Sequence, residues 1–364
     1  MKITKENILI ALSEVQDPDL KKDLVTLGMI QNILPSEDVI KFTVVLTTPA
    51  CPLKELIRKD CEKAIAKHFG DSIKVEIEMS STVTTIRENA PLLPGVKNII
   101  AVSSGKGGVG KSTVAANLAV SLAKSGASVG LIDADIFGPS VPTMFNCEFE
   151  QPGVTQVDGK NKILPILQYG VKLMSIGFLA PPENAVVWRG PMASSALKQF
   201  LGDTIWGDLD YLLIDLPPGT SDIHLTLVQS VPVTGAIVVT TPQKVALADA
   251  QKGIQMFQQP QINVPVLGVV ENMAYFTPAE LPDNRYYIFG ENGGKNLAEK
   301  FEVNYLGQIP IVQSIRESGD SGYPAALKDD QSAKAFNELA QTLAQKVAIR
   351  NASSEQTKKV EINV

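Results

Sequence analysis

The sequence contains few cysteines and histidines. Its 364 residues include three cysteines, Cys51, Cys61 and Cys147, and only two histidines. An odd and sparse set of cysteines excludes a disulfide scaffold and is typical of a reducing compartment. Because thiols and imidazoles are the usual zinc ligands, this chain alone has few residues from which a zinc site could be built.

The sequence also lacks an excess of positive charge and any long apolar run. Lys and Arg number 33 against 39 Asp and Glu, and the net charge is −6. This balance argues against a nucleic-acid coat or a polybasic membrane anchor, so we expect neither nucleic acid nor membrane as a partner. No stretch approaches the roughly eighteen apolar residues of a membrane span, and the first ten residues lack a signal-peptide pattern. The sequence therefore predicts a soluble, cytoplasmic protein.

What the sequence does contain is enough apolar material for two domains. Hydrophobic residues make up 44% and charged residues 20%, which supports a sizeable core at this length. Helical and strand-like patterns predict a small α+β domain over residues 1–88. Prolines and a glycine predict a linker over 89–97. A second domain is expected over 98–350, followed by a flexible polar tail over 351–364.

Short apolar runs recur after residue 98, and helical stretches separate most of them. Continuous rather than alternating hydrophobicity is typical of strands that are buried on both faces. The second domain is therefore predicted to be an α/β fold with a mainly parallel sheet covered by helices. Residues 162–177 fit a hairpin inserted in this scheme. The predicted strands lie at 99–103, 129–133, 211–215, 236–240 and 266–270.

The strongest motif lies at residues 105–113, which read GKGGVGKST. It matches the GxxxxGK[ST] pattern of a phosphate-binding loop between a strand and a helix. Glycines let successive N–H groups converge on phosphate oxygens, and the helix N-terminus adds its dipole. Lys111 is expected to reach the β- and γ-phosphates, and the Ser112 hydroxyl to ligate Mg²⁺. The predicted nucleotide-binding residues are Gly105, Lys106, Gly107, Gly108, Val109, Gly110, Lys111, Ser112 and Thr113.

Lys106 is a second lysine in this loop, at a position where the generic pattern asks for none. It precedes the curl of the loop, so its side chain can project across the mouth of the site. A cation there could stabilise charge on a phosphate of a facing subunit, as an arginine finger does. On residue type alone, a solvated surface lysine is the favoured reading.

Aspartates end two of the predicted strands. Asp133 and Asp135 lie at the end of one strand, and Asp215 ends another. Open parallel sheets bind ligands at the carboxyl ends of their strands. We therefore expect Asp215 to hold Mg²⁺ or its waters, and Asp133 or Asp135 to orient the attacking water. For one of the three, helix capping is the alternative role.

Together these motifs resemble the deviant Walker A ATPases, which include MinD, ParA, ArsA and nitrogenase iron protein. The resemblance rests on KGGVGKST at 106–113, DAD at 133–135 and DLPPGT at 215–220. Three further segments resemble the Mrp/ApbC subfamily: IFGPS at 136–140, WRGPM at 188–192 and VENM at 270–273. Residues 17–19, 27–28 and 48–52 are similar to a small iron–sulfur assembly domain that is often fused to this subfamily.

The resemblance implies an ATPase that carries iron–sulfur clusters or helps to load them onto apoproteins, and that acts as an ATP-gated homodimer. It implies ATP and Mg²⁺ as cofactors, and iron–sulfur assembly proteins and apoprotein clients as partners. The implied catalytic residues are Lys106, which would reach the nucleotide of the other subunit, Lys111, and Asp135, which would position water. The other implied roles are Mg²⁺ organisation by Asp133 and Asp215, adenine binding by Asn272, and packing of Pro310 against the base.

One segment departs from the subfamily pattern. There, the stretch after the Asn-Met pair carries a CxxC that holds a cluster across the dimer, whereas residues 274–285 here read AYFTPAELPDNR. Because thiolates are the ordinary cluster ligands, cluster binding would move to Cys51 or to a partner protein. Cys51 matches the motif cysteine of the assembly domain. Cys61 fits a core position in a helix, and Cys147 has no predicted role.

Two other functions remain open. A positioning ATPase of the MinD or ParA kind needs a basic amphipathic tail or a basic patch, but the final fourteen residues contain two Lys and two Glu. The other alternative is a regulatory or chaperone ATPase that has lost cluster binding.

Overall fold

The computed structural model of the chain describes residues 2–88, 91–136, 138–179, 190–278, 280–281 and 283–360. The chain divides into two compact units, and each is described by itself. The first comprises Met1–Thr85 and Ala344–Ser354, and the second comprises Ile86–Leu343 and Glu355–Val364. Among the described residues, no helix has the length and apolar character needed to cross a bilayer.

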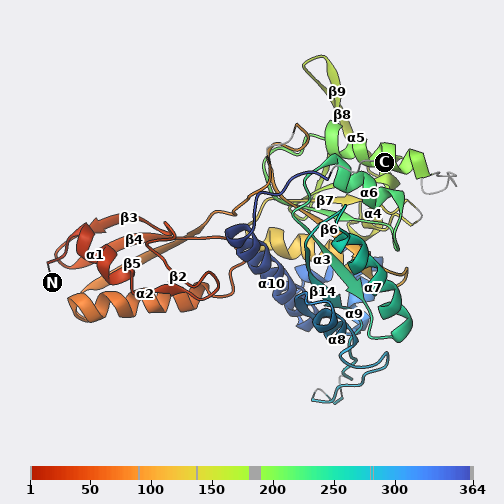
Figure 1. The fold of residues 1–364 in the computed structure, drawn as a ribbon. Coiled ribbons are helices and arrows are strands. Elements are labelled where there is room, and N and C mark those ends of the chain that lie inside the picture. Colours follow the sequence, from red (N-terminus) through yellow and green to blue (C-terminus); the bar gives the residue numbers. More distant parts are fainter. Residues whose placement is uncertain are drawn as a thin grey trace. The chain divides into compact units, whose positions relative to one another are not determined.

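The first unit is a small α+β domain in which helices pack on a sheet (Figure 1). The sheet has the order β3-β4-β5, with β3 antiparallel and β5 parallel to β4. Its core buries Ile8, Phe42 and Ile65. Helices and strands are both present, as the predicted α+β class requires. The elements are α1 (Lys5–Leu12), β1 (Gln16–Asp17), β2 (Lys22–Asp23), β3 (Ile30–Pro35), β4 (Val39–Leu46), α2 (Lys54–Phe69) and β5 (Lys74–Ser81).

The second unit is built on a mainly parallel sheet, which confirms the predicted fold class. In the described part of the chain this sheet has eight strands in the order β10-β11-β7-β12-β6-β13-β14-β15. Only the β10–β11 pair among them is antiparallel. The strands are β6 (Val96–Ser104), β7 (Val129–Asp133), β10 (Ile166–Gln168), β11 (Val171–Ser175), β12 (Leu209–Asp215), β13 (Gly235–Thr240), β14 (Val266–Glu271) and β15 (Tyr305–Gln308).

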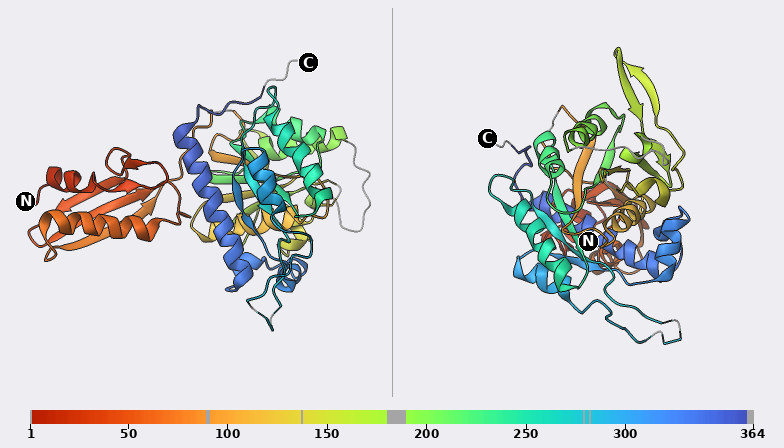
Figure 2. Two further views of the ribbon diagram at one scale, coloured as in Figure 1. Left: turned by 60° about the horizontal axis from the view of Figure 1, so that its bottom comes forward. Right: turned by 90° about the vertical axis from the view of Figure 1, so that its right-hand side faces the viewer.

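Helices cover both faces of this sheet (Figures 1 and 2). Along β12, residues 211–215 are all buried, although successive side chains point to opposite faces. On one face, Leu197 of α5 and Leu227 of α6 share a core with Leu212. The helices are α3 (Lys111–Lys124), α4 (Val141–Met144), η1 (Ile176–Leu179), α5 (Gly190–Asp203), α6 (Asp222–Ser230), α7 (Lys244–Gln258), α8 (Gly293–Lys300), α9 (Gln313–Asp320), η2 (Ala325–Leu327) and α10 (Gln331–Ser353).

Between α4 and α5, the described residues form two hairpins. The predicted one is formed by β10 and β11, and β11 also joins the main sheet beside β7. The other, β8 (Gly153–Val157) and β9 (Lys160–Leu164), was not predicted. It projects from the body of the second unit (Figure 2). Its apolar residues Val154 and Val157 are exposed, so the sequence carries no burial pattern that would reveal it.

The C-terminal segment differs from the predicted flexible tail. Helix α10 continues past Arg350 to Ser353. Beyond it, the Thr357 backbone N–H donates to Ile86 at 2.9 Å, and that of Val360 donates to Val228 at 3.0 Å. Backbone hydrogen bonds therefore hold residues that composition alone marks as a tail. Residues 361–364, and residues 89 and 90 of the predicted linker, lie outside the described residues.

A substitution at Phe257 of α7 tests the core of the second unit, because this side chain is 0% exposed. Phe257→Ala is expected to lower the free energy of unfolding by about 3–5 kcal/mol through lost burial and a residual cavity. Val245→Ala on the same helix is the control, since Val245 is 62% exposed and should cost less than about 0.5 kcal/mol. Urea unfolding followed by tryptophan fluorescence measures both, because Trp206 belongs to the second unit and is buried there. Equal midpoints for the two variants would contradict this account of the core.

Candidate functional site

The glycine-rich loop connects β6 to α3 at the carboxyl edge of the sheet. Gly108 and Gly110 have φ angles of 82° and 79°, which lie in the left-handed region that glycine adopts without strain. Gly105 has a different requirement, because a Cβ there would lie 2.0 Å from the backbone carbon of Asp249 in α7. The loop thus needs glycine at these positions for its curl and for its close approach to α7.

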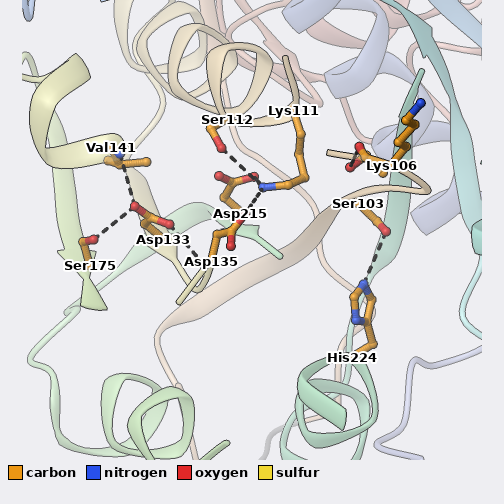
Figure 3. A network of polar contacts seen from close by, with 11 residues as sticks. Ser103, Lys106, Lys111, Ser112, Asp133, Asp135, Val141, Ser175, Asp215 and His224 are labelled. Carbon is orange, nitrogen blue, oxygen red and sulfur yellow. Dashed lines mark hydrogen bonds and ion pairs between the residues drawn. The ribbon is translucent and has the colours of Figure 1, made fainter. Parts of the chain in front are cut away.

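Lys111 is the buried centre of the site (Figure 3). Its ammonium Nζ lies 2.7 Å from Asp215 Oδ1 and 3.6 Å from Asp135 Oδ2. The Ser112 hydroxyl oxygen is 3.3 Å away. Since the side chain is 6% exposed, two carboxylates compensate a cation that would otherwise be costly to bury. The structure therefore brings together four residues that the sequence predicted for one site.

Asp215 ends β12, and its carboxylate is fully buried. Burial raises its pKa, while the ammonium of Lys111 lowers it. One oxygen accepts from Lys111. The other, Oδ2, is buried and has no hydrogen-bond partner among the described residues. An unpaired carboxylate oxygen near a serine hydroxyl fits a hard cation such as Mg²⁺, which often uses one carboxylate together with phosphate oxygens and waters.

Asp133, to which the resemblance assigned Mg²⁺ organisation, ends β7 and has hydrogen-bond donors on both carboxylate oxygens. Its Oδ2 accepts hydrogen bonds from the Val141 backbone N–H and the Ser175 hydroxyl, both at 3.1 Å. Its Oδ1 accepts from the Asp135 backbone N–H at 3.2 Å. Burial, followed by the charge of Asp215, raises the pKa of Asp133 to about 7. With both oxygens engaged, this carboxyl group positions α4 and the backbone of Asp135.

Lys106 and Asp135 both line a cavity of about 190 Å³ beside the glycine-rich loop. The Asp135 side chain is 14% exposed, so it combines access to the cavity with proximity to Lys111. Lys106 is exposed. Its ammonium points away from Lys111 and the aspartates (Figure 3). The two lysines of the loop therefore face different surroundings.

A larger cavity of about 620 Å³ adjoins this one, and the two share Gly110, Thr113 and Met144 in their linings. Pro310 and Asn272, which the sequence marked, both line the larger cavity. A cavity of this size with mainly apolar walls suits a planar ligand. Its apolar wall includes Pro139, Met144, Met273, Pro310, Ile311, Val312 and Ile315.

Asn272 also contacts the glycine-rich loop. Its amide Nδ2 donates to the carbonyl oxygen of Val109 at 2.8 Å. A Cβ on Gly110 would lie 2.2 Å from the same nitrogen. Asn272 therefore lines the larger cavity and holds the loop through Val109, a role that its position after a strand did not reveal.

The cysteines are not arranged as a cluster site. Cys61 is 0% exposed in the core of the first unit, as predicted, and Cys147 is 1% exposed. Burial raises the pKa of both thiols to about 12. Burial also raises the pKa of Cys51, which lines a cavity of only about 10 Å³, the size of one water molecule. Among the described residues, no group of three or more His, Cys, Asp or Glu could hold a metal ion.

The segment between β14 and α8, where the subfamily carries its CxxC, is held by aromatic and backbone contacts. Phe276 forms bridges with Tyr286 and Ile311, and the Arg285 guanidinium lies 4.4 Å from the centre of the Tyr275 ring. Residues 279 and 282 of this segment lie outside the described residues, as do Phe137, Trp188 and Arg189 of the other subfamily motifs.

Comparisons with known proteins match both parts of the chain to known families. The family described as NUBPL iron-transfer P-loop NTPase matches residues 95–348, and the family described as iron–sulfur cluster assembly protein matches residues 5–77. An iron–sulfur cluster carrier protein of Synechocystis sp. is 47% identical and covers 95% of this chain and 99% of its own length. The iron–sulfur cluster carrier protein of Escherichia coli K12 is 45% identical, with 93% of this chain and 89% of its own length covered.

A solved structure supports the fold of the second unit. A nucleotide-binding protein from Archaeoglobus fulgidus in complex with ADP is 42% identical to this chain, with a TM-score of 0.55. The alignment covers 63% of this chain and 88% of that protein.

Gly105→Ala tests the close approach of the loop to α7. We expect it to lower the free energy of unfolding by at least about 1–3 kcal/mol, since backbone atoms must move to admit the methyl group. Gly107→Ala is the matched control, because its nearest neighbour would be Pro218 Cγ at 3.8 Å. Urea unfolding without nucleotide compares them, and a wild-type midpoint for Gly105→Ala would show that the approach is not required.

Proposed function

The chain belongs to the NUBPL-type iron-transfer P-loop NTPases and carries an N-terminal iron–sulfur assembly domain, and from this premise we propose that it couples ATP hydrolysis to cluster delivery. It binds ATP between two copies of the chain and carries iron–sulfur clusters, or helps to load them, onto apoproteins. The observation that carries the proposal is the buried contact of Lys111 with Asp215 and Asp135 beside the loop cavity.

When ATP binds, its phosphate oxygens replace carboxylate oxygens as the anionic partners of Lys111. A triphosphate in the cavity of about 190 Å³ attracts the ammonium that Asp215 holds at 2.7 Å in this structure. Lys111 then bonds the β- and γ-phosphates, and backbone N–H groups of residues 105–113 bond the remaining phosphate oxygens. The release of Asp215 from its ion pair is the first consequence of nucleotide binding.

The Ser112 hydroxyl and the carboxylate of Asp215 are the groups that hold Mg²⁺. The buried, unpaired Oδ2 of Asp215 supports this assignment. When bound, Mg²⁺ neutralises charge on the β- and γ-phosphates. Asp133 contributes indirectly, because its hydrogen bond to the Asp135 backbone at 3.2 Å fixes the residue that lines the phosphate cavity.

Asp135 acts on the attacking water. Its carboxylate lines the phosphate cavity and lies 3.6 Å from Lys111. Once Lys111 turns to the phosphates, a carboxylate oxygen of Asp135 can accept a hydrogen bond from a water molecule and orient its lone pair toward phosphorus. In the adjoining cavity, Pro310 packs on the adenine ring and the free amide oxygen of Asn272 accepts from the exocyclic amine.

Lys106 completes the site of a second copy of the chain. Its exposure and its direction away from Lys111 support a role outside its own phosphate cluster. In the homodimer its ammonium reaches the phosphates of the other nucleotide, so hydrolysis depends on dimerisation. Hydrolysis removes these contacts, loosens the segments around Asp135 and Asp215, and so alters the affinity for the cluster.

Cys51 is the residue of this chain proposed to hold the cluster, which is cargo. Cys51 is half-buried, and this burial raises the pKa of its thiol, so binding of iron must displace the thiol proton. A cluster shared by two copies of Cys51, or delivered on a partner protein, fits the absence of cysteine from 274–285. The same burial favours the second candidate function, a regulatory or chaperone ATPase without a cluster.

The two lysines separate binding from hydrolysis. Lys111→Ala is expected to lower the affinity for ATP about 100-fold, because it removes charge-assisted hydrogen bonds to phosphate. Lys106→Ala should leave the Kd within about threefold and lower kcat about 1,000-fold, the scale of a missing finger in trans. Calorimetric titration with ATP and a phosphate-release assay measure these effects. Equal loss of binding in both variants would refute the role of Lys106 in trans.

Anaerobic reconstitution tests the cargo. The wild-type chain, supplied with iron and sulfide, is expected to gain both elements and a broad visible absorption, and Cys51→Ser is expected to gain neither. Cys147→Ala is the control, since its Sγ donates to the Pro142 carbonyl in the second unit and should leave the iron content unchanged. If wild type and Cys51→Ser both stay colourless, this chain does not carry a cluster by itself, and the regulatory ATPase is favoured.

A further inference from the structure

His224 is a buried titratable residue beside the site, and the mechanism above does not use it. It lies in the first turn of α6 and is 1% exposed. Burial lowers its pKa to about 4, so the ring is neutral at physiological pH. Its ring lies 6.3 Å from that of Phe257, and Lys111 is the charged group that acts on it electrostatically.

The hydrogen bonds of His224 define its tautomer. The Ser221 backbone N–H, which can only donate, lies 3.2 Å from Nδ1. Nδ1 must therefore be the accepting nitrogen of the neutral ring. The proton is then on Nε2, which donates to the Ser103 hydroxyl oxygen at 3.4 Å (Figure 3). The Ser221 hydroxyl also lies 3.2 Å from Nδ1, and Ser221 and His224 form the capping box of α6. A neutral imidazole thus bonds Ser221 through Nδ1 and Ser103 through Nε2.

These two segments are neighbouring parts of the phosphate cavity wall. Ser103 is in β6, one residue before Ser104, and Ser104 lines the cavity. Ser221 ends the loop that starts after Asp215, and Pro218 of that loop lines the same cavity. The loop is also bonded to β6 through its backbone, since the Gly219 N–H donates to the Ser104 carbonyl at 2.8 Å.

A side chain also holds the far end of the loop, at Ser221. Gly219 has a φ of 80°, and a Cβ there would find no atom within 4 Å, so neighbouring side chains do not clamp the middle of the loop. Near Asp215, the Leu216 N–H donates to Val102 at 3.0 Å. At the other end, His224 supplies the link between Ser221 and β6.

We propose that neutral His224 is a positioning residue for ATP hydrolysis, which holds loop 216–221 against the strand that leads into the phosphate-binding loop. The inference rests on the proposed ATPase function. In this role, His224 keeps the loop's backbone and Pro218 at a fixed distance from the reacting phosphate, although His224 itself does not contact the nucleotide. A misplacement of about 1 Å in such a wall can cost about 100-fold in rate.

His224→Leu and His224→Gln test the inference together. Leu removes both hydrogen bonds and keeps an apolar volume, so kcat should fall about 10- to 100-fold while the Kd for ATP changes less than about threefold. Gln can accept through Oε1 and donate through Nε2, and it should retain kcat within about threefold. Ser103→Ala, which leaves the ring in place, should give a smaller loss of kcat. His68→Gln, in the first unit, is the control and should match wild type.

Nitrogen-15 NMR of the histidine rings supplies a readout that a loss of packing alone would not mimic. The chain contains two histidines, so His68→Gln assigns the spectrum. His224 is expected to show the neutral tautomer with the proton on Nε2, and no titration between about pH 6 and 8. A charged ring, or a proton on Nδ1, would overturn the proposal.

The kinetic outcomes separate this inference from the proposed function. An active wild type with equal kcat for His224→Leu refutes the positioning role alone. Loss of kcat in both His224→Leu and His224→Gln also refutes it, because the hydrogen bonds would then not be the relevant feature. A wild-type chain that binds ATP and never hydrolyses it refutes the proposed function, and this inference with it.

Discussion

The buried ammonium of Lys111 is the constraint on which the second unit depends. A cation that is 6% exposed is stable only beside carboxylates, and these come from the ends of two different strands, β7 and β12. Those strands must therefore be neighbours and must be parallel, as they are. The glycines of the loop, the capping of α4 by Asp133 and the hydrogen bond from Asn272 to Val109 all maintain the pocket in which this ion pair is held.

The parts of the site that lie at strand ends could be predicted from the sequence. A continuous apolar run defines a buried strand, and a polar residue at its end then falls at the sheet edge, which is why Asp135 and Asp215 were found. Lys111 and Ser112 could also be predicted, because the loop motif is defined by residues that are close together in the sequence. The continuous apolar runs likewise predicted the parallel sheet.

Contacts between distant residues could not be predicted in this way. Ser103 and His224 are 121 positions apart, and Val109 and Asn272 are 163 apart. No periodicity within a helix or strand records which side chain will meet which loop. Asp133 is a similar case. The sequence places it at a strand end, where a metal role was expected. The Val141 N–H and the Ser175 hydroxyl that donate to its carboxylate belong to other segments, and only the tertiary structure shows that they meet it.

The first unit is completed by residues from the far end of the chain. Ala344–Ser354 belongs to it, and there the Gln345 amide donates to Asp19 at 2.7 Å, while Asn351 donates to Thr84 at 2.9 Å. During synthesis, domains generally fold in the order in which they leave the ribosome. Here the domain made first must wait for the last helix, so its final contacts form only after the nucleotide-binding unit has been translated.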